Sequence, residues 1–410
     1  MAVKKDVLFL CQFFYPEYVS SATLPYDTAL ALKNAGFSVD ALCGYPKEYA
    51  TGQNVPTKET VNGIHIHRLK YLQLGRKGFV SRLINYFSFT LMVVLQLLKL
   101  ARYKAVVVYS NPPILPWIAS WGKVLFGTKL VFVTYDLYPE IGIRTGALRE
   151  GNIICRLMDH INKCVYRRAD AVVALSKEMR EFILANREIP AERVHVIPNW
   201  YEDKGALNRK GEGNPFVEEI GDRFVVSYFG NMGTAQDMQT ICDAAHILKD
   251  NPEVFFLFTG HGNKLDTVRQ SMADVKNCKI CDFLHGEDFQ NALRISDCAL
   301  VSLEKGLSGL AVPSKTYSYM MHGIPLLAIM DEGDIVSDIE QGAGAWVRNG
   351  ESEKLASMIR KLCSDRAKQK KMSEKCRSIF LEKYTTPICT GKYVDFFGTL
   401  LGNDKEISKS

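Results

Sequence analysis

The sequence predicts an α/β protein of two domains, each with a parallel sheet covered by helices. At 410 residues the chain is too long for one ordinary core and fits two domains of ~200 residues. Short continuous apolar runs, typical of buried parallel strands, alternate with helical segments along most of the chain. A polar, glycine-rich stretch from Glu202 to Asp222 interrupts this alternation and is expected to link the domains.

These boundaries define the expected organisation of the chain. It comprises an N-terminal domain over residues 1–200, a linker over 201–222, a C-terminal domain over 223–385, a C-terminal helix over 386–401 and a disordered tail over 402–410.

Composition excludes several classes of protein. The chain is 47% hydrophobic and 23% charged, with a modest net charge of +6, and it lacks the dense basic stripe of a nucleic-acid binder. The 11 cysteines are scattered, which fits a reducing cytosol. Cys278 and Cys281 have metal-ligand spacing, but no second pair completes a site, so we expect no metal. The basic N-terminus has only a short apolar run, which indicates a first strand and not a signal peptide.

The first domain opens with a βαβ pattern. Val7–Cys11 and Val39–Cys43 are predicted strands, and they flank a helix from about Thr23 to Ala35. The loop before this helix carries Ser20 and Ser21, and it is expected to face a ligand because parallel sheets bind ligands at the carboxyl ends of their strands. It is not a GxGxxG loop, so a dinucleotide cofactor is weakly supported.

An unusually apolar stretch, Tyr86 to Leu100, follows in the first domain. Its fifteen residues fall short of the roughly 20 needed to span a bilayer. One interpretation is a helix buried in the domain; the other is a helix at a membrane face with its basic flanks on anionic headgroups. The two are compatible, since one face can pack while another touches lipid. The flanking basic residues are Arg76, Lys77, Arg82, Arg102 and Lys104.

Acidic residues emerge at the end of a later strand. The apolar run Leu130–Thr134 leads into Asp136 and Glu140, where functional groups of parallel sheets usually lie. Asp136 is therefore a candidate site residue, although it could instead cap a turn. A helix over Asn152–Arg168 follows, and Ser176 is expected to cap the next helix.

Three successive strands of the second domain are each followed by glycine. Because glycine lets the main chain approach closely, these loops are expected to converge on one ligand. The loops contain Gly230, Asn231 and Gly233; Gly260 and Gly262; and Leu284, His285 and Gly286.

Lys315 is predicted in the first turn of a helix that begins near Pro313 and ends at Gly323. A strand and a loop of small residues precede this helix. Free N–H groups, the helix dipole and the Lys315 ammonium would form an anion site, which we interpret as the site of nucleotide-sugar phosphates. Lysine is unfavourable to the dipole at this position, which indicates a function. The alternative is a solvated surface lysine beside an ordinary turn.

Five segments resemble, in order and spacing, motifs of the retaining family 4 glycosyltransferases. The likeness covers nearly the whole chain and favours the bacterial polysaccharide-assembly branch that makes O-antigen and capsule. It implies the GT-B fold, in which two Rossmann-like domains flank a central cleft, the C-terminal domain binds most of the donor, and the last helix returns to the first domain. The segments are ALSKEM, VHVIPNW, YFGNMGTAQDMQTICDAA, FLFTGHGN and PSKTYSYMMHGIPLLAI.

The resemblance implies roles for individual residues. It places Asp136 at the donor sugar and makes Lys315, beside Ser314, the cation for the leaving diphosphate. The remaining assignments are Gly230, Asn231 and Gly233 at the diphosphate, Gly260 and Gly262 at the nucleotide, Leu284 and His285 at the base, Gly309 and Leu310 at the sugar, and Ser20 and Ser21 at the phosphates.

Two departures from the family pattern matter. Leu310 and Ser318 stand where many members carry two glutamates, so Ser318 or Tyr319 is expected to bind the ribose instead. Thr234 and Gln236 replace a basic pair that often follows the first glycine loop, which leaves Lys315 as the one obvious cation.

The resemblance implies a retaining hexosyl or N-acetylhexosaminyl transferase with a UDP- or GDP-linked donor. Its acceptor would be a lipid-linked saccharide, and the protein would be cytoplasmic and peripheral at the inner face of the plasma membrane. No Asp-x-Asp pair is present to hold a divalent ion, so metal-independent chemistry is expected. Two alternatives are a nucleotide-sugar 2-epimerase, for which no acid/base set is apparent, and a non-catalytic sugar-nucleotide-binding partner of an assembly complex, which the missing glutamates favour.

Overall fold

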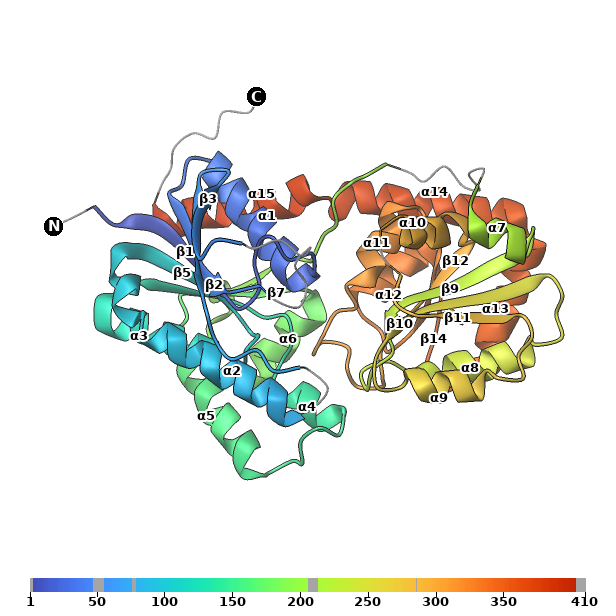
Figure 1. Ribbon diagram of the computed structural model, residues 1–410, viewed down its shortest axis with the longest axis horizontal. Coiled ribbons are helices and arrows are strands. Elements are labelled where there is room, and N and C mark those ends of the chain that lie inside the picture. Colours follow the sequence, from blue (N-terminus) through green and yellow to red (C-terminus); the bar gives the residue numbers. More distant parts are fainter. Residues whose placement is uncertain (1–2, 47–54, 76–78, 206–212, 285, 403–410) are drawn as a thin grey trace. The chain divides into compact units, whose positions relative to one another are not determined.

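The computed structural model describes residues 3–46, 55–75, 79–205, 213–284 and 286–402. The chain forms two compact units (Figure 1). Unit 1 comprises Met1–Ile143, Ala147–Asn199 and Thr386–Ser410, and unit 2 comprises Arg144–Gly146 and Trp200–Thr385.

Unit 1 contains an eight-stranded sheet in the order β3-β4-β2-β1-β5-β6-β7-β8. Every neighbouring pair is parallel except β3 with β4. Strand order reverses between β1 and β5, and the carboxyl ends at such a switch point are where open α/β sheets bind ligands. The strands are β1 (Lys5–Cys11), β2 (Val39–Gly44), β3 (Lys58–Val61), β4 (Ile64–Leu69), β5 (Tyr103–Tyr109), β6 (Lys129–Val133), β7 (Ala171–Ala174) and β8 (Val194–Val196).

Helices cover the sheet of unit 1, and one of them comes from the far end of the chain. α15 follows unit 2 in sequence but packs against α1 (Figure 1). Cys389, Tyr393 and Phe397 form its buried face, and their spacing of four places them on one side of the helix. The helices are α1 (Ser20–Asn34), α2 (Phe79–Val94), α3 (Leu115–Phe126), α4 (Glu140–Arg144), α5 (Ile153–Arg168), α6 (Lys177–Asn186) and α15 (Thr386–Leu401), with 3₁₀ turns η1 (Leu97–Arg102) and η2 (Ala191–Arg193).

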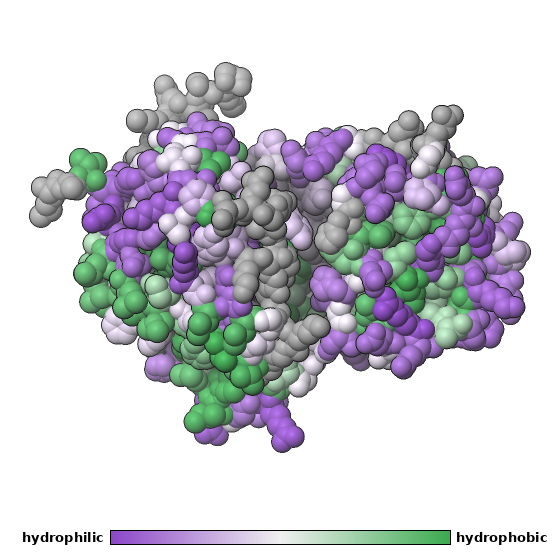
Figure 2. All heavy atoms as spheres, in the orientation of Figure 1, coloured by the Kyte–Doolittle hydropathy of each residue, from purple (hydrophilic) through white to green (hydrophobic). Residues whose placement is uncertain are grey.

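The apolar stretch from Tyr86 to Leu100 is divided between α2 and η1. One face is buried, with Phe89 and Val93 fully covered, whereas Phe87 is 56% and Leu91 60% exposed. The buried face agrees with the interpretation of a helix packed in the domain, and contact of the exposed face with a membrane stays a prediction. Figure 2 shows apolar side chains gathered on this face of unit 1, over α2. Within the described residues, no helix has the length and apolar character needed to traverse a bilayer.

Unit 2 contains a six-stranded parallel sheet in the order β11-β10-β9-β12-β13-β14. Its strand order reverses between β9 and β12, so the carboxyl ends of these strands form its switch point. The strands are β9 (Phe224–Asn231), β10 (Val254–His261), β11 (Cys278–Cys281), β12 (Cys298–Ser302), β13 (Leu326–Ile329) and β14 (Gly344–Val347).

The helices of unit 2 begin within the stretch expected as a linker. α7 follows Asn214, whose side chain caps it, and buries Phe216 and Ile220. α11 begins at Lys315, two residues later than expected. The helices are α7 (Pro215–Ile220), α8 (Met238–Ile247), α9 (Leu265–Ser271), α10 (Gly286–Ile295), α11 (Lys315–Met321), α12 (Asp334–Asp338), the π-helix η3 (Ile339–Ala343), α13 (Ser352–Ser364) and α14 (Arg366–Lys383).

Other expectations have direct outcomes in the structure. Ser176 caps α6 by accepting a hydrogen bond from the Met179 N–H at 3.2 Å, as expected. Cys278 and Cys281 lie on β11. The described part of the chain contains no group of three or more His, Cys, Asp or Glu suited to a metal, and independence from metal stays a prediction. The tail expected over 402–410 lies outside the described residues apart from Gly402.

Candidate active site

The carboxyl ends of β9 and β10, and the loops that continue from them, pack directly against each other at the switch point of unit 2. A Cβ on Gly260 would lie 1.8 Å from the Gly230 carbonyl oxygen, and one on Gly262 would lie 2.4 Å from that of Met232. Only glycine permits this approach. Two of the three predicted glycine segments, those of β9 and β10, therefore come together, and part of the reason for these glycines is contact between the two segments themselves.

Lys315 lies against this pair of loops. Its Nζ is 3.7 Å from the centre of the Tyr228 ring and donates to the Asn231 carbonyl at 3.4 Å. A cation over an aromatic face is stabilised by the ring quadrupole. The ammonium forms no ion pair with any residue in the described ranges. It is thus a half-buried positive charge, held in place by neutral groups, beside two loops of main chain.

The surroundings of Lys315 disfavour its charge. Burial lowers the pKa of its ammonium to about 7. His261, between the two glycines of the β10 loop, also has a lowered pKa because of burial and then the charge of Lys315. An anion bound at this place would restore the charged form of Lys315. The arrangement is suited to a phosphate group whose negative charge increases during a reaction.

A second cation, absent from our sequence predictions, lies beside the β9 loop. Lys264 Nζ donates to the Gln236 carbonyl and to Glu304 Oε1, both at 2.7 Å. Gln236 Oε1 accepts the Gly233 N–H at 3.0 Å. Lys264 and Glu304 are 40 residues apart, so no local pattern could reveal the pair. Because Glu304 neutralises Lys264, Lys315 remains the cation without an acidic partner here.

The residues expected to bind ribose lie inside unit 2. Tyr319 is fully buried, and its hydroxyl accepts the Phe229 N–H at 2.9 Å. Ser318 is 8% exposed and donates to the Lys315 carbonyl at 2.9 Å. The Tyr319 hydroxyl therefore links α11 to β9, whereas the Ser318 hydroxyl bonds within α11 itself. Ser314, in contrast, is exposed and its side chain does not cap α11.

The loop after β12 contains the two residues expected at the donor sugar. Gly309 has a φ of 82°, which is a left-handed conformation that favours glycine. The Leu310 N–H donates to the Leu307 carbonyl at 3.0 Å, so this amide already has a partner. Leu284, expected near the base, donates its N–H to Thr259 Oγ1 at 3.2 Å. His285 lies outside the described residues.

The candidate residues of unit 1 lie at the carboxyl ends of its strands. Ser20 and Ser21 begin α1, after the β1 loop, and Asp136 follows β6. Ser110, directly after β5, accepts the N–H groups of Tyr135 at 3.0 Å and Asp136 at 3.1 Å. Its place directly after an apolar strand was a signal that our sequence analysis missed.

Among the residues that the structure describes, no polar group stabilises the charge of the Asp136 carboxylate. Burial raises the pKa of Asp136 to about 6, and no hydrogen bond from a described residue reaches its carboxylate. Asp136 therefore does not cap a turn. A carboxyl group with a raised pKa at the edge of a parallel sheet is typical of functional sites.

Two family models match the chain. The first, described as a glycosyl transferase 4-like domain, matches residues 22–200, and the second, described as glycosyl transferases group 1, matches residues 223–365. Each unit therefore carries a glycosyltransferase domain, and the two α/β units have the GT-B fold.

Individual proteins show the same relationship. The probable glycosyltransferase WbjE of Pseudomonas aeruginosa is 28% identical over 72% of this chain and 74% of its own. The putative colanic acid biosynthesis glycosyl transferase WcaI of Escherichia coli is 22% identical over 48% of this chain and 49% of its own. The crystal structure of Anabaena HepE in complex with UDP-glucose has the same fold, with a TM-score of 0.71 and 15% identity over 96% of this chain and all of that one.

The two shifted pKa values predict a narrow pH optimum. We expect kcat/KM, which reports the free enzyme, to fall below about pH 6 as Asp136 becomes protonated and above about pH 7 as Lys315 loses its proton. The alkaline limb of kcat should lie at higher pH, because a diphosphate bound at Lys315 would stabilise the ammonium. Lys315→Arg should remove the alkaline limb, since arginine stays protonated. A wild-type kcat/KM that stays constant up to pH 9 would contradict this role of Lys315.

Proposed function

We propose that this protein transfers a hexosyl or N-acetylhexosaminyl group, with retention, from a UDP- or GDP-sugar to a lipid-linked saccharide in bacterial surface polysaccharide synthesis. The main support is Lys315, an ammonium without an acidic partner among the described residues, which lies against Tyr228, Gly230 and Asn231 at the switch point of unit 2. Two similar proteins favour the same chemistry: WcaI is described as a putative colanic acid biosynthesis glycosyl transferase, and HepE has been crystallised in complex with UDP-glucose.

Each group of candidate residues would have a different role in such a reaction. Lys315 would stabilise the diphosphate as it gains charge, which is where electrostatic catalysis acts most strongly. The backbone of the β9 and β10 loops would lie against the phosphates and nucleotide. Asp136 and the start of α1 would serve the sugar and phosphate side from unit 1.

A panel of nucleotide-sugars tests this proposal. Purified protein is incubated with UDP-, GDP- and dTDP-sugars, and donor hydrolysis, epimer formation and transfer are followed by chromatography. Transfer or slow hydrolysis of one donor supports the proposal. Epimerised donor would indicate a 2-epimerase, and binding without turnover would indicate a non-catalytic partner. The anomeric configuration of the product, measured by NMR, tests retention.

Metal independence gives a second prediction. Without a carboxylate pair for Mg²⁺ or Mn²⁺, we expect the transfer rate to stay within about twofold when a chelator is added. The measurement compares initial rates with and without EDTA at saturating donor. Activity that EDTA abolishes and Mn²⁺ restores would contradict the prediction.

We also propose that unit 1 binds the membrane that holds the acceptor, through the apolar residues exposed on α2. Phe87→Ser with Leu91→Ser should lower co-sedimentation with anionic liposomes, because both side chains are more than half exposed and each buried CH₂ contributes about 0.8 kcal/mol. The fraction bound should also fall as salt rises, since nearby Lys and Arg contribute about 1 kcal/mol each. Equal binding to neutral and anionic vesicles at every salt concentration would contradict the electrostatic part.

A further inference from the structure

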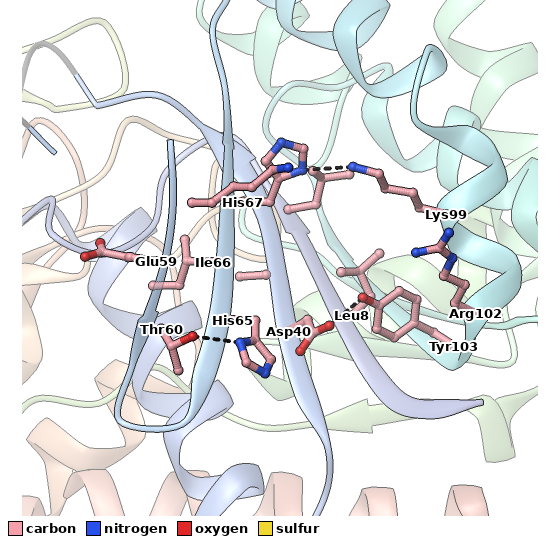
Figure 3. Close-up of a pocket in the computed structure, with 13 residues that line it drawn as sticks. Leu8, Asp40, Glu59, Thr60, His65, Ile66, His67, Lys99, Arg102 and Tyr103 are labelled. Atoms are coloured by element: carbon pink, nitrogen blue, oxygen red, sulfur yellow. Dashed lines mark hydrogen bonds between the residues drawn. The ribbon is translucent and has the colours of Figure 1, made fainter. Parts of the chain in front are cut away.

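A pocket of ≈ 450 Å³ opens on unit 1 between the β3–β4 hairpin and η1 (Figure 3). Asp40 and His65 pair near the starts of β2 and β4, and Tyr103 begins β5. The pocket therefore lies toward the amino ends of these strands. The distance from Asp40 to the end of β2 at Gly44 is about 13 Å, since a strand rises about 3.3 Å per residue. The pocket is therefore separate from the carboxyl edge of the sheet, where Ser20 lies.

The acidic groups that line this pocket already have partners. The Asp40 carboxylate accepts hydrogen bonds from Lys5 Nζ at 2.7 Å and Tyr103 Oη at 2.6 Å. Glu59 is ion-paired with Arg68 at 2.5 Å, and Figure 3 shows its carboxylate pointing away from the other labelled side chains. Neither carboxylate is therefore available to balance further positive charge in the pocket.

Three cationic side chains face the same pocket without an acidic partner. Lys58, Lys99 and Arg102 line it, and none forms an ion pair with a residue that the structure describes. Lys99 and Arg102 are three residues apart on a 3₁₀ turn, which places them on one side. Lys58 lies opposite His67 across β3 and β4.

The cations of the pocket repel one another. Lys99 Nζ lies 3.0 Å from His67 Nδ1 (Figure 3). Burial, followed by the charges of Lys58 and Arg102, lowers the pKa of Lys99. Burial, followed by the charges of Lys99 and Lys58, lowers the pKa of His67. An anion among these groups would relieve the repulsion and restore their charged forms.

The outer side of the same segment is apolar. Leu98 of η1 is 79% exposed, and Leu95 and Leu91 before it are 67% and 60% exposed. A row of exposed leucines beside a basic pocket matches the chemistry of a bilayer surface, where phosphates lie next to acyl chains. A free phosphate would explain the cations but not the leucines.

We propose that the pocket of Lys58, Lys99 and Arg102 binds the phosphate of an anionic phospholipid headgroup, while the exposed leucines of α2 and η1 contact the acyl chains. This inference rests on the proposed membrane association of unit 1. Beyond that association, we infer that one pocket binds the lipid phosphate, so membrane binding would not depend on the net charge of the protein alone.

The test compares two charge-matched triple variants. Lys58→Gln/Lys99→Gln/Arg102→Gln removes the pocket cations, and Lys368→Gln/Lys370→Gln/Lys371→Gln removes three exposed lysines of α14 in unit 2. The binding of the wild type and of both variants is measured on vesicles of phosphatidylcholine with and without phosphatidylglycerol. Circular dichroism verifies that both variants fold. The pocket variant should lose about 100-fold in its partition onto phosphatidylglycerol vesicles, from about 5-fold per basic residue. The control should lose less than about 3-fold, because its lysines lie in the other unit and outside the proposed contact.

Three results would overturn the inference. Equal losses in both variants would show that net charge alone determines binding, and no loss in the pocket variant would show that the pocket does not contact lipid. If inorganic phosphate raises the Tm of the wild type but not of the pocket variant, while both bind vesicles equally, the pocket is a site for free phosphate. Vesicle binding needs no nucleotide-sugar, so this readout stays valid if the donor panel shows no transfer.

Discussion

Lys315→Ala is expected to lower kcat/KM by about 10- to 150-fold. A charge-assisted hydrogen bond to phosphate contributes roughly 1.5–3 kcal/mol, and each 1.36 kcal/mol is a factor of ten in rate. Part of the loss should appear in kcat at saturating donor, because in the proposed reaction the diphosphate would gain charge as the sugar leaves. Steady-state kinetics with the donor identified by the panel provides the measurement.

Three further variants distinguish the effect of the Lys315 charge on activity from the effect of its packing. Lys315→Met keeps an unbranched side chain over the Tyr228 ring and should lose as much activity as the alanine variant. Lys315→Arg keeps the charge in a different shape and should recover part of the rate. Lys305→Met removes an exposed lysine from the loop after β12 and should stay within about twofold of wild type. If Lys315→Ala agrees with wild type within twofold at an unchanged Tm, Lys315 is only a surface residue.

Gly260→Ala is expected to lower kcat/KM by about 100-fold and the free energy of unfolding by about 3 kcal/mol. The added Cβ would lie 1.8 Å from the Gly230 carbonyl oxygen, so one of the two loops must move. Overpacking of this kind typically costs about 1–3 kcal/mol, and a displacement of about 1 Å at a reacting site can cost about 100-fold in rate. Chemical denaturation and donor kinetics measure the two effects.

Gly350→Ala is the matched control for this variant. Gly350 has a φ of 85° and open space at its Cβ position, so alanine there should cost about 1–2 kcal/mol of backbone strain without displacing a loop. Its donor kinetics should resemble those of the wild type. If Gly260→Ala binds and turns over donor as the wild type does, the contact between the β9 and β10 loops does not shape the site.

The sequence predicts the sheets well because their strands are continuous apolar runs. Leu326–Ile329 matches β13, and Val39–Cys43 differs from β2 by one residue. α3 has no expected counterpart, because Pro112, Pro113 and Pro116 obscure its apolar pattern. A strand buried on both faces can be recognised in the sequence because all its side chains are apolar. A helix is recognised by the periodic spacing of its apolar residues, and prolines near its start make that spacing hard to see.

The site could be predicted only where its residues follow one another in sequence. The glycine loops and Lys315 lie in contiguous motifs and were found. The ring beneath Lys315 belongs to Tyr228 on β9, and Lys264 meets Glu304 across 40 residues, so neither contact leaves a local pattern. Tyr319 differs for another reason: α11 is buried on all sides from Thr316 to Met321, so its polar side chains face other residues of unit 2, which their types alone do not reveal.

The return of α15 to unit 1 determines the order in which the enzyme can be completed during synthesis. α15 buries Cys389, Tyr393 and Phe397, packs against α1 and accepts a hydrogen bond at its Leu400 carbonyl from Lys129. During translation, α1 leaves the ribosome long before Thr386 is synthesised. The apolar surface of unit 1 that α15 later covers therefore stays exposed until the last helix is made. Unit 2 is almost entirely continuous from Trp200 to Thr385, so its folding does not have to wait for a distant segment of the chain. The unit that is translated first is therefore finished last, and a nascent chain must be shielded along α1 until its final helix arrives.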